Sequence, residues 1–196
     1  MNAEHIACTD ATVIPSTDGV AIVMHDFGGT GSPVLLSHAT GFHAHCWEPM
    51  ATTLSTRHHV MALDHRGYGD AETVDPATIG WQQYGNDALA AARHLSAQHN
   101  GAPIVGVGHS MGGASLLMAA QREPQLFTAL FVFEPMTPLT KHTVYIRTLE
   151  APPGVSIKCK LPLFDVVSWA STMVGYTDVC PSGHIECILN GDVCQF

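Results

Sequence analysis

The sequence predicts an α/β fold in which a mostly parallel sheet carries helices on both faces. Between residues 33 and 134, short apolar runs bounded by glycine or proline alternate with amphipathic segments. This alternation is typical of parallel strands joined by right-handed helical crossovers. The chain has 196 residues, of which 46% are hydrophobic and 13% charged, so it is long enough for one domain with a sizeable core.

The first predicted elements are two short strands within residues 11–26, which flank an Asp18-Gly19 turn. Four apolar runs then have the length and the flanking residues of buried parallel strands. Three intervening segments have helical patterns, and the last of them stops at Pro124. In chain order, these elements are strand 33–38, helix 46–55, strand 58–65, helix 81–98, strand 102–108, helix 111–123 and strand 128–134.

The longest predicted helix shows the periodicity best. Five of its larger or apolar residues recur at helical spacing and therefore share one face: Trp81, Tyr84, Ala88, Ala92 and Leu95. A face of this kind is expected to pack on the sheet.

The alternating pattern stops near Pro138. We therefore divide the chain into an α/β core over residues 1–138 and a divergent C-terminal segment over residues 139–196, in which the last strands of the sheet are missing or divergent. Without further strands, the run 128–134 would form an edge of the sheet. The apolar run 160–174 is then the candidate segment to cover that edge.

Composition excludes several classes of function. The formal net charge is −9 and no basic cluster occurs, which argues against nucleic acid as a partner. No apolar run reaches the ~18–20 residues of a membrane span. The N-terminus lacks a signal-peptide pattern, so a cytoplasmic location is expected. The six cysteines form no CxxC pair, which argues against a zinc ribbon and favours free thiols.

The chemistry-bearing motif is Gly108-His109-Ser110-Met111-Gly112, a G-x-S-x-G pattern between a predicted strand and a predicted helix. At a sharp strand-to-helix turn, side chains two residues on either side of the serine would clash, so glycine is favoured there. Such a turn presents the serine hydroxyl as a nucleophile. It also directs the N–H of Met111 toward a developing oxyanion.

A second oxyanion donor is expected from the loop after strand 33–38. A histidine followed by small residues at this place often shapes such a donor from the loop backbone. Counting from His38, the N–H of Thr40 is the first candidate, with Gly41 and Phe42 as alternatives. A purely structural loop remains the other interpretation.

Four segments together resemble the α/β-hydrolase fold superfamily, in particular its single-domain serine esterases. They are "HATGFHAHCW" (38–47), "ALDHRGYGD" (62–70), "GVGHSMGG" (106–113) and "LFVFEP" (130–135), in the family's order and spacing. The resemblance covers about residues 11–138. It implies that Asp64 and Arg66 hold together the loop after strand 58–65.

In this superfamily the catalytic acid and histidine follow the serine in the chain, so both partners are expected after Ser110. Glu134 ends the next strand and is the first candidate acid, with Asp165 and Asp178 as weaker candidates. His184 lies in a Ser-Gly-His turn similar to that of the family and is the candidate base. His109 is expected to point away from the serine.

The predicted function is serine-dependent hydrolysis of small carboxylic esters through an acyl-enzyme intermediate. The alternative is a non-catalytic scaffold that has lost a competent histidine and acid; acyl transfer or carbon–carbon bond hydrolysis would use the same turn.

No cofactor is implied. His43-x-His45 lacks the HExxH motif or a carboxylate partner in the sequence, so no metal is expected. The oligomeric state is left open.

Overall fold

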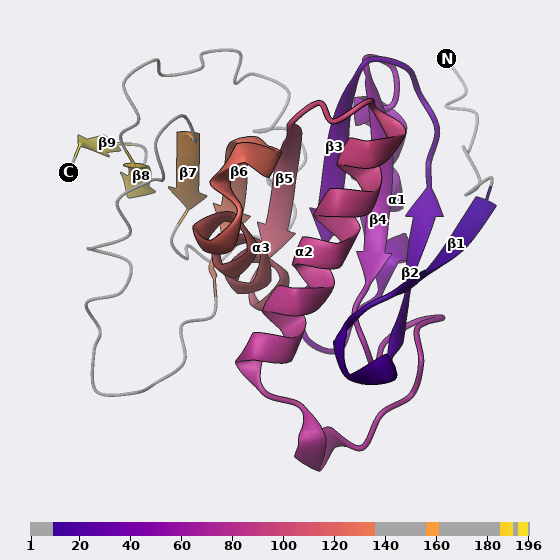
Figure 1. The fold of residues 1–196 in the computed structure, drawn as a ribbon. Coiled ribbons are helices and arrows are strands. Elements are labelled where there is room, and N and C mark those ends of the chain that lie inside the picture. Colours follow the sequence, from indigo (N-terminus) through magenta and orange to yellow (C-terminus); the bar gives the residue numbers. More distant parts are fainter. Residues whose placement is uncertain (1–9, 136–155, 161–184, 190–191, 196) are drawn as a thin grey trace, which may run out of the picture.

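The computed structural model describes residues 10–135, 156–160, 185–189 and 192–195. These residues form one nine-stranded sheet in the order β1-β2-β4-β3-β5-β6-β7-β8-β9 (Figure 1). Helices lie on both faces of the sheet, as the sequence predicts. The described helices include none that is both long and apolar enough to cross a membrane.

The elements follow the predicted order. The strands are β1 (Asp10–Pro15), β2 (Ala21–Asp26), β3 (Ser32–Ser37), β4 (His58–Asp64), β5 (Ile104–His109), β6 (Phe127–Phe133), β7 (Ser156–Lys160), β8 (Ile185–Leu189) and β9 (Asp192–Gln195). The α-helices are α1 (Glu48–Leu54), α2 (Trp81–Gln98) and α3 (Met111–Arg122). Short 3₁₀ turns are η1 (Thr17–Gly19), η2 (Ala44–Trp47), η3 (Pro76–Thr78) and η4 (Pro124–Leu126).

The sheet is parallel from β4 through β3, β5, β6 and β7 to β8. The β1–β2 hairpin joins antiparallel to β4, and β9 joins antiparallel to β8. The three strands β7 to β9 come from the segment to which the sequence pattern assigned no element. Strand β6 therefore has neighbours on both sides, and the edge expected there does not form because β7 supplies the missing hydrogen bonds.

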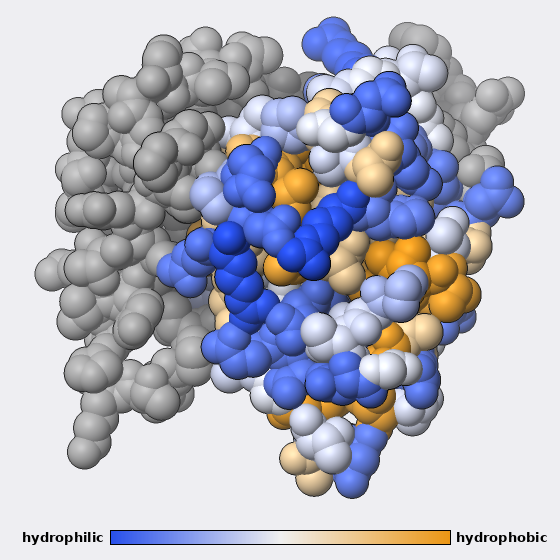
Figure 2. Space-filling model, in the orientation of Figure 1, coloured by the Kyte–Doolittle hydropathy of each residue, from blue (hydrophilic) through white to orange (hydrophobic). Residues whose placement is uncertain are grey.

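Two apolar cores lie on opposite faces of the sheet. One core packs α2 and α3 on the sheet and includes Ala88, Ala92 and Leu95 from the predicted face of α2. The other packs α1 and η2 on the opposite face around Trp47 and Leu36. The surface over α2 is mostly hydrophilic in Figure 2, as expected for a helix that packs with one face and meets water with the other.

A buried ion pair joins α2 to the loop after β4. Arg66 is 3% exposed, and its Nε and Nη2 donate hydrogen bonds of 2.8–3.1 Å to the carboxylate of Asp87, which is fully buried. The hydroxyl of Ser16 donates to the same carboxylate at 2.5 Å. Burial alone would raise the pKa of Asp87, but the nearby His65 ring and the Arg66 hydrogen bonds outweigh it and lower the pKa to about 2. The loop role implied for Arg66 thus has a physical basis.

Replacing Asp87 with asparagine should leave the Arg66 guanidinium buried without a counter-charge. We expect Asp87→Asn to lower the free energy of unfolding by about 3–5 kcal/mol, measured by urea denaturation at pH 7. Because the folded-state pKa of Asp87 lies below its ordinary value, its contribution is present above pH 4 and is lost as the pH falls toward 2. An Asp75→Asn control, at an exposed turn, should change stability by less than about 1 kcal/mol. Equal effects of the two variants would contradict this account.

Candidate active site

Ser110 occupies the sharp turn between β5 and α3 that the G-x-S-x-G motif predicts. Its backbone adopts φ 51° and ψ −113°, a conformation that residues with a side chain rarely take. Its N–H donates a 2.8 Å hydrogen bond to the carbonyl of Phe133, and its carbonyl accepts from Ala114 in the first turn of α3. The turn is thus fixed on both sides, and strain of this kind concentrates at functional sites.

The two motif glycines explain how the turn closes. A Cβ on Gly108 would lie 2.6 Å from the backbone nitrogen of Gly113. A Cβ on Gly112 would lie 2.2 Å from the carbonyl oxygen of Ser37 and 2.6 Å from that of His38. Any side chain at Gly112 would therefore push the first turn of α3 away from the end of β3. The predicted steric need for glycine is present at both positions.

The same contact packs the start of α3, which follows Ser110, against the end of β3, from which the Thr40 loop departs. Met111 begins α3, where the first backbone N–H groups have no partner within the helix. Gly112, the next residue, touches the carbonyls of Ser37 and His38, from which the loop to Thr40 departs. That loop is closed by a 3.1 Å hydrogen bond from the N–H of Phe42 to the carbonyl of Ala39. Thr40 lies in this turn and is exposed.

The ring of His38 supports this loop through two hydrogen bonds. The ring is fully buried, and its Nε2 accepts a 3.3 Å hydrogen bond from the N–H of His65. The proton must then sit on Nδ1, which donates to the carbonyl of Ala39 at 2.8 Å. Burial and the neighbouring His65 lower the pKa of His38 to about 4, so the ring is neutral at pH 7. The two hydrogen bonds require a neutral ring, because a protonated histidine has no nitrogen that can accept.

Two tyrosines lie against the buried histidines: Tyr84, from the predicted face of α2, and Tyr68, which the sequence analysis does not identify. Tyr68 meets His38 edge-on at 5.3 Å between ring centroids, and Tyr84 meets His65 edge-on at 5.7 Å. Burial and a hydrogen bond with Tyr68 raise the pKa of Tyr84 above its ordinary value, so it stays protonated. Tyr68 lies in a loop and Tyr84 in α2, so no local motif in the sequence predicts that the two residues lie close together.

Glu134, the candidate acid, lies at the same rim as Ser110. It directly follows β6 and has a positive φ of 45°, so two adjacent strands each end in a strained, non-glycine residue. Its Oε2 lies 3.8 Å from Nε2 of His109, and both side chains are partly exposed. The expectation that His109 points away from Ser110 did not anticipate this approach to Glu134.

The candidate base, His184, lies outside the described residues, as do the alternative acids Asp165 and Asp178. Within residues 10–135, the hydroxyl of Ser110 has no imidazole at hydrogen-bond distance. The structure places Ser110 and Glu134 after neighbouring strands and packs the start of α3 against the end of β3, while the catalytic roles of these residues stay predictions. The position of the base remains a prediction.

One group of side chains in the described residues has the composition of a metal site. His25, His45 and Asp70 each offer a ligand atom, and these atoms lie within 4.8 Å of one another. His45 belongs to the His43-x-His45 pair, and the sequence showed no carboxylate near it. The fold brings Asp70 to this place from the turn after β4. This group includes His25 on β2, which is separated from β5 by β4 and β3.

A methyl group at Gly112 should disrupt the turn. We expect Gly112→Ala to lower the free energy of unfolding by about 1–3 kcal/mol, because α3 must move away from two carbonyl oxygens. Gly113→Ala is the matched control: its Cβ meets its nearest neighbour at 3.2 Å, and alanine favours a helix. Thermal unfolding of the two variants tests this difference, and equal stability would count against the close approach.

The lowered pKa of His38 predicts a specific acid sensitivity. Between pH 6.5 and about 4 the unfolded chain binds a proton on this ring and the folded protein does not, so stability falls as the pH is lowered through this window. The loss should reach roughly 3 kcal/mol at most. His38→Asn should reduce this loss, measured by urea unfolding at pH 7 and 4.5, whereas His94→Asn should not. An unchanged acid loss in His38→Asn would refute the prediction.

Known proteins share this fold and this arrangement of elements. The family model described as "Serine aminopeptidase, S33" matches residues 28–161. The chain is 26% identical over 137 residues to the monoglyceride lipase of Homo sapiens, which covers 68% of this chain and 45% of the human protein. It is 30% identical over 104 residues to an (E)-2-((N-methylformamido)methylene)succinate hydrolase of Acinetobacter baylyi, which covers 53% of this chain and 38% of that enzyme.

Among solved structures, an α/β hydrolase from Novosphingobium aromaticivorans superposes with a TM-score of 0.56 at 28% identity, covering 64% of this chain and 44% of that one. The chain thus spans less than half the length of each of these relatives. The family model covers more than half of this chain. The chain therefore belongs to the serine aminopeptidase S33 family within the α/β-hydrolase superfamily.

Proposed function

We propose that this protein is a serine hydrolase that cleaves carboxylic esters through an acyl-enzyme intermediate on Ser110. The observation that carries the proposal is the strained conformation of Ser110, held between β5 and α3 by two glycines whose Cβ atoms would clash. A fold does not by itself define a function, but this strained turn is a feature of the site. The names of the relatives, a lipase and a hydrolase, support the same reaction class.

In the proposed reaction, His184 takes the hydroxyl proton of Ser110 while the oxygen attacks the ester carbonyl carbon. The N–H groups of Met111 and Thr40 bind the negative charge that develops on the carbonyl oxygen. The carbon–oxygen bond to the alcohol then breaks, and His184 returns the proton to the departing alcohol. Water, deprotonated by the same histidine, then attacks the acyl carbon; the bond from this carbon to the Ser110 oxygen breaks, and His184 returns the proton to that oxygen as the acid leaves. Glu134 orients His184 and stabilises its charged form.

The proposed substrates are esters with an apolar acyl group. Phe42, in the same turn as Thr40, is a large apolar residue with 53% of its surface exposed, so it is accessible to a ligand. The human relative is named a monoglyceride lipase, and such a substrate has an apolar chain on an ester. In this proposal, Phe42 contacts the acyl chain of an ester whose carbonyl lies between Met111 and Thr40.

Covalent labelling tests the nucleophile. A fluorophosphonate probe should label the wild-type protein on Ser110 and leave Ser110→Ala unlabelled, with the site assigned by peptide mass spectrometry. Ser32→Ala, at an exposed serine that contacts His58, is the matched control and should label normally. Folded wild-type protein that is not labelled would refute the enzymatic proposal and favour a non-catalytic scaffold.

Turnover of a p-nitrophenyl ester tests the partners of Ser110. We expect His184→Ala to lower kcat by a factor of roughly 10²–10⁴, because the general base is lost, with Glu134→Gln giving a smaller loss. His109→Ala should keep most of the activity, since the proposal gives this ring no proton to transfer. A collapse of kcat in His109→Ala with retained activity in His184→Ala would contradict the assignment and point to the His109–Glu134 pair.

A further inference from the structure

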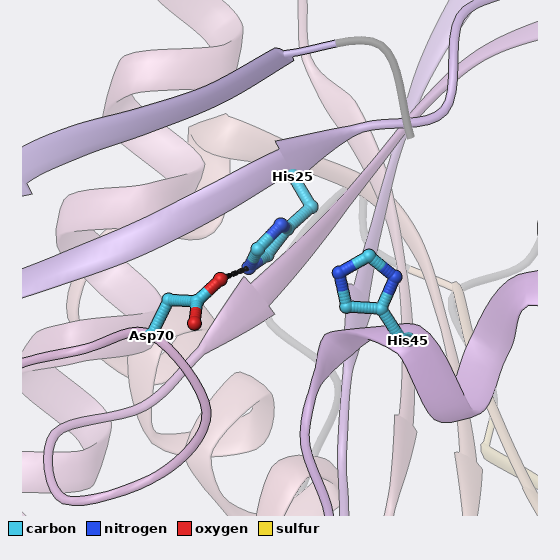
Figure 3. Close-up of side chains that lie close together, drawn as sticks. All are labelled: His25, His45 and Asp70. Atoms are coloured by element: carbon cyan, nitrogen blue, oxygen red, sulfur yellow. Dashed lines mark ion pairs between the residues drawn. The ribbon is translucent and has the colours of Figure 1, made fainter. Parts of the chain in front are cut away.

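A second cluster of reactive side chains lies outside the candidate active site and takes no part in the proposed reaction. It consists of His25 on β2, His45 on η2 and Asp70 in the turn after β4 (Figure 3). Nε2 of His25 lies 3.8 Å from Oδ2 of Asp70, and the rings of His25 and His45 meet edge-on with centroids 4.7 Å apart. Figure 3 shows the His45 ring across from His25, with Asp70 reaching the His25 ring from another side.

We propose that His25, His45 and Asp70 form a binding site for a zinc ion. Two imidazole nitrogens and one carboxylate oxygen are ligands that zinc commonly takes, at about 2.0–2.2 Å each. The present separations of up to 4.8 Å exceed those between ligands on one tetrahedral ion, so the side chains must close by about 1 Å or more. Asp70, with 72% of its side chain exposed, is able to make this movement.

The cluster is prearranged by one buried carboxylate, Asp64. Its Oδ1 accepts a 2.6 Å hydrogen bond from the N–H of Ala44, the residue before His45. Its Oδ2 accepts from the N–H of Asp70 at 2.9 Å and lies 2.8 Å from Nε2 of His25. A single side chain that is 1% exposed therefore fixes the positions of all three segments that supply the ligands. Metal sites depend on outer partners of this kind.

Charge and access also suit a divalent cation. His25 is 2% exposed, whereas Asp70 is open to solvent, so an ion can reach the buried nitrogen from the Asp70 side. The carboxylates of Asp64 and Asp70 together carry two negative charges beside Nε2 of His25. An ion at Nε2 replaces the contact between Nε2 and Asp64, and any proton held there passes to solvent, while the hydrogen bonds from the N–H groups of Ala44 and Asp70 to Asp64 continue to hold the two other ligand segments. Water completes the coordination.

A bound ion would link β2, the segment that follows the Thr40 loop and the turn after β4. Its expected role is to hold the loop that carries the candidate oxyanion donor. Because β4 and β3 lie between β2, which carries His25, and β5, the proposal gives the ion no part in the attack by Ser110.

Calorimetric titration of Zn²⁺ into chelator-treated full-length protein tests this site. Wild-type protein should bind one more Zn²⁺ per chain than His45→Ala, and Asp70→Asn should weaken this site by roughly tenfold or more. His94→Ala, which removes a histidine of α2 that contacts Gln98, is the matched control and should bind as wild type does. Thiols elsewhere in the chain contribute equally to all four proteins and cancel in the comparison.

Thermal unfolding supplies a second readout that does not depend on activity. Added Zn²⁺ should raise the Tm of wild type and His94→Ala but not of His45→Ala, and without metal Asp70→Asn should unfold close to wild type because Asp70 is exposed. Equal Zn²⁺ binding by wild type and His45→Ala, or no Zn²⁺ uptake by folded wild type, would overturn the proposal. Neither result depends on Ser110.

Discussion

The close approach of α3 to the end of β3 is the constraint on which the rest of this site depends. Gly112 lets the helix backbone touch the carbonyls of Ser37 and His38, and that contact sets the start of both the helix and the Thr40 loop. Ser110 is forced into its left-handed conformation between them. Close packing of one backbone on another thus joins the ends of β3 and β5, where the proposed nucleophile and its two proposed N–H donors lie.

Buried polar groups then hold the surrounding loops at this rim. His38 supports the Thr40 loop through its two ring nitrogens, and Asp87 on α2 anchors Arg66. Asp64 accepts hydrogen bonds from the backbone N–H groups of Ala44 and Asp70. Each of these buried groups has hydrogen-bond partners, without which it would destabilise the fold. The contacts of Asp64 also bring together the three segments that carry His25, His45 and Asp70.

Local pattern was sufficient for the elements up to β6 and for Ser110. Apolar runs bounded by glycine and proline identify the buried strands, and the face shared by Ala88, Ala92 and Leu95 identifies α2. The G-x-S-x-G spacing carries its own steric reason, which the clashes at Gly108 and Gly112 bear out. The placement of Glu134 at the rim of Ser110 follows because adjacent parallel strands end at one edge.

Features that depend on contacts between segments far apart in the chain could not be predicted from local sequence patterns. The segment 156–160, "SIKCK", alternates polar and apolar residues and joins the sheet only because β6 offers an unpaired edge. His109 approaches Glu134 across two neighbouring strand ends, and neither this contact nor the positive φ of Glu134 is evident from spacing in the sequence. His25, His45 and Asp70 come from three separate segments, so only the fold brings them together.

The central claim is that Ser110, Met111 and Thr40 converge on one reacting carbonyl. A crystal structure of the protein after reaction with a fluorophosphonate tests it most directly. The account predicts phosphorus bonded to the Ser110 oxygen, with the phosphoryl oxygen about 2.7–3.1 Å from the N–H nitrogens of both Met111 and Thr40. A phosphoryl oxygen directed away from these two N–H groups, or phosphorus on another residue, would contradict it.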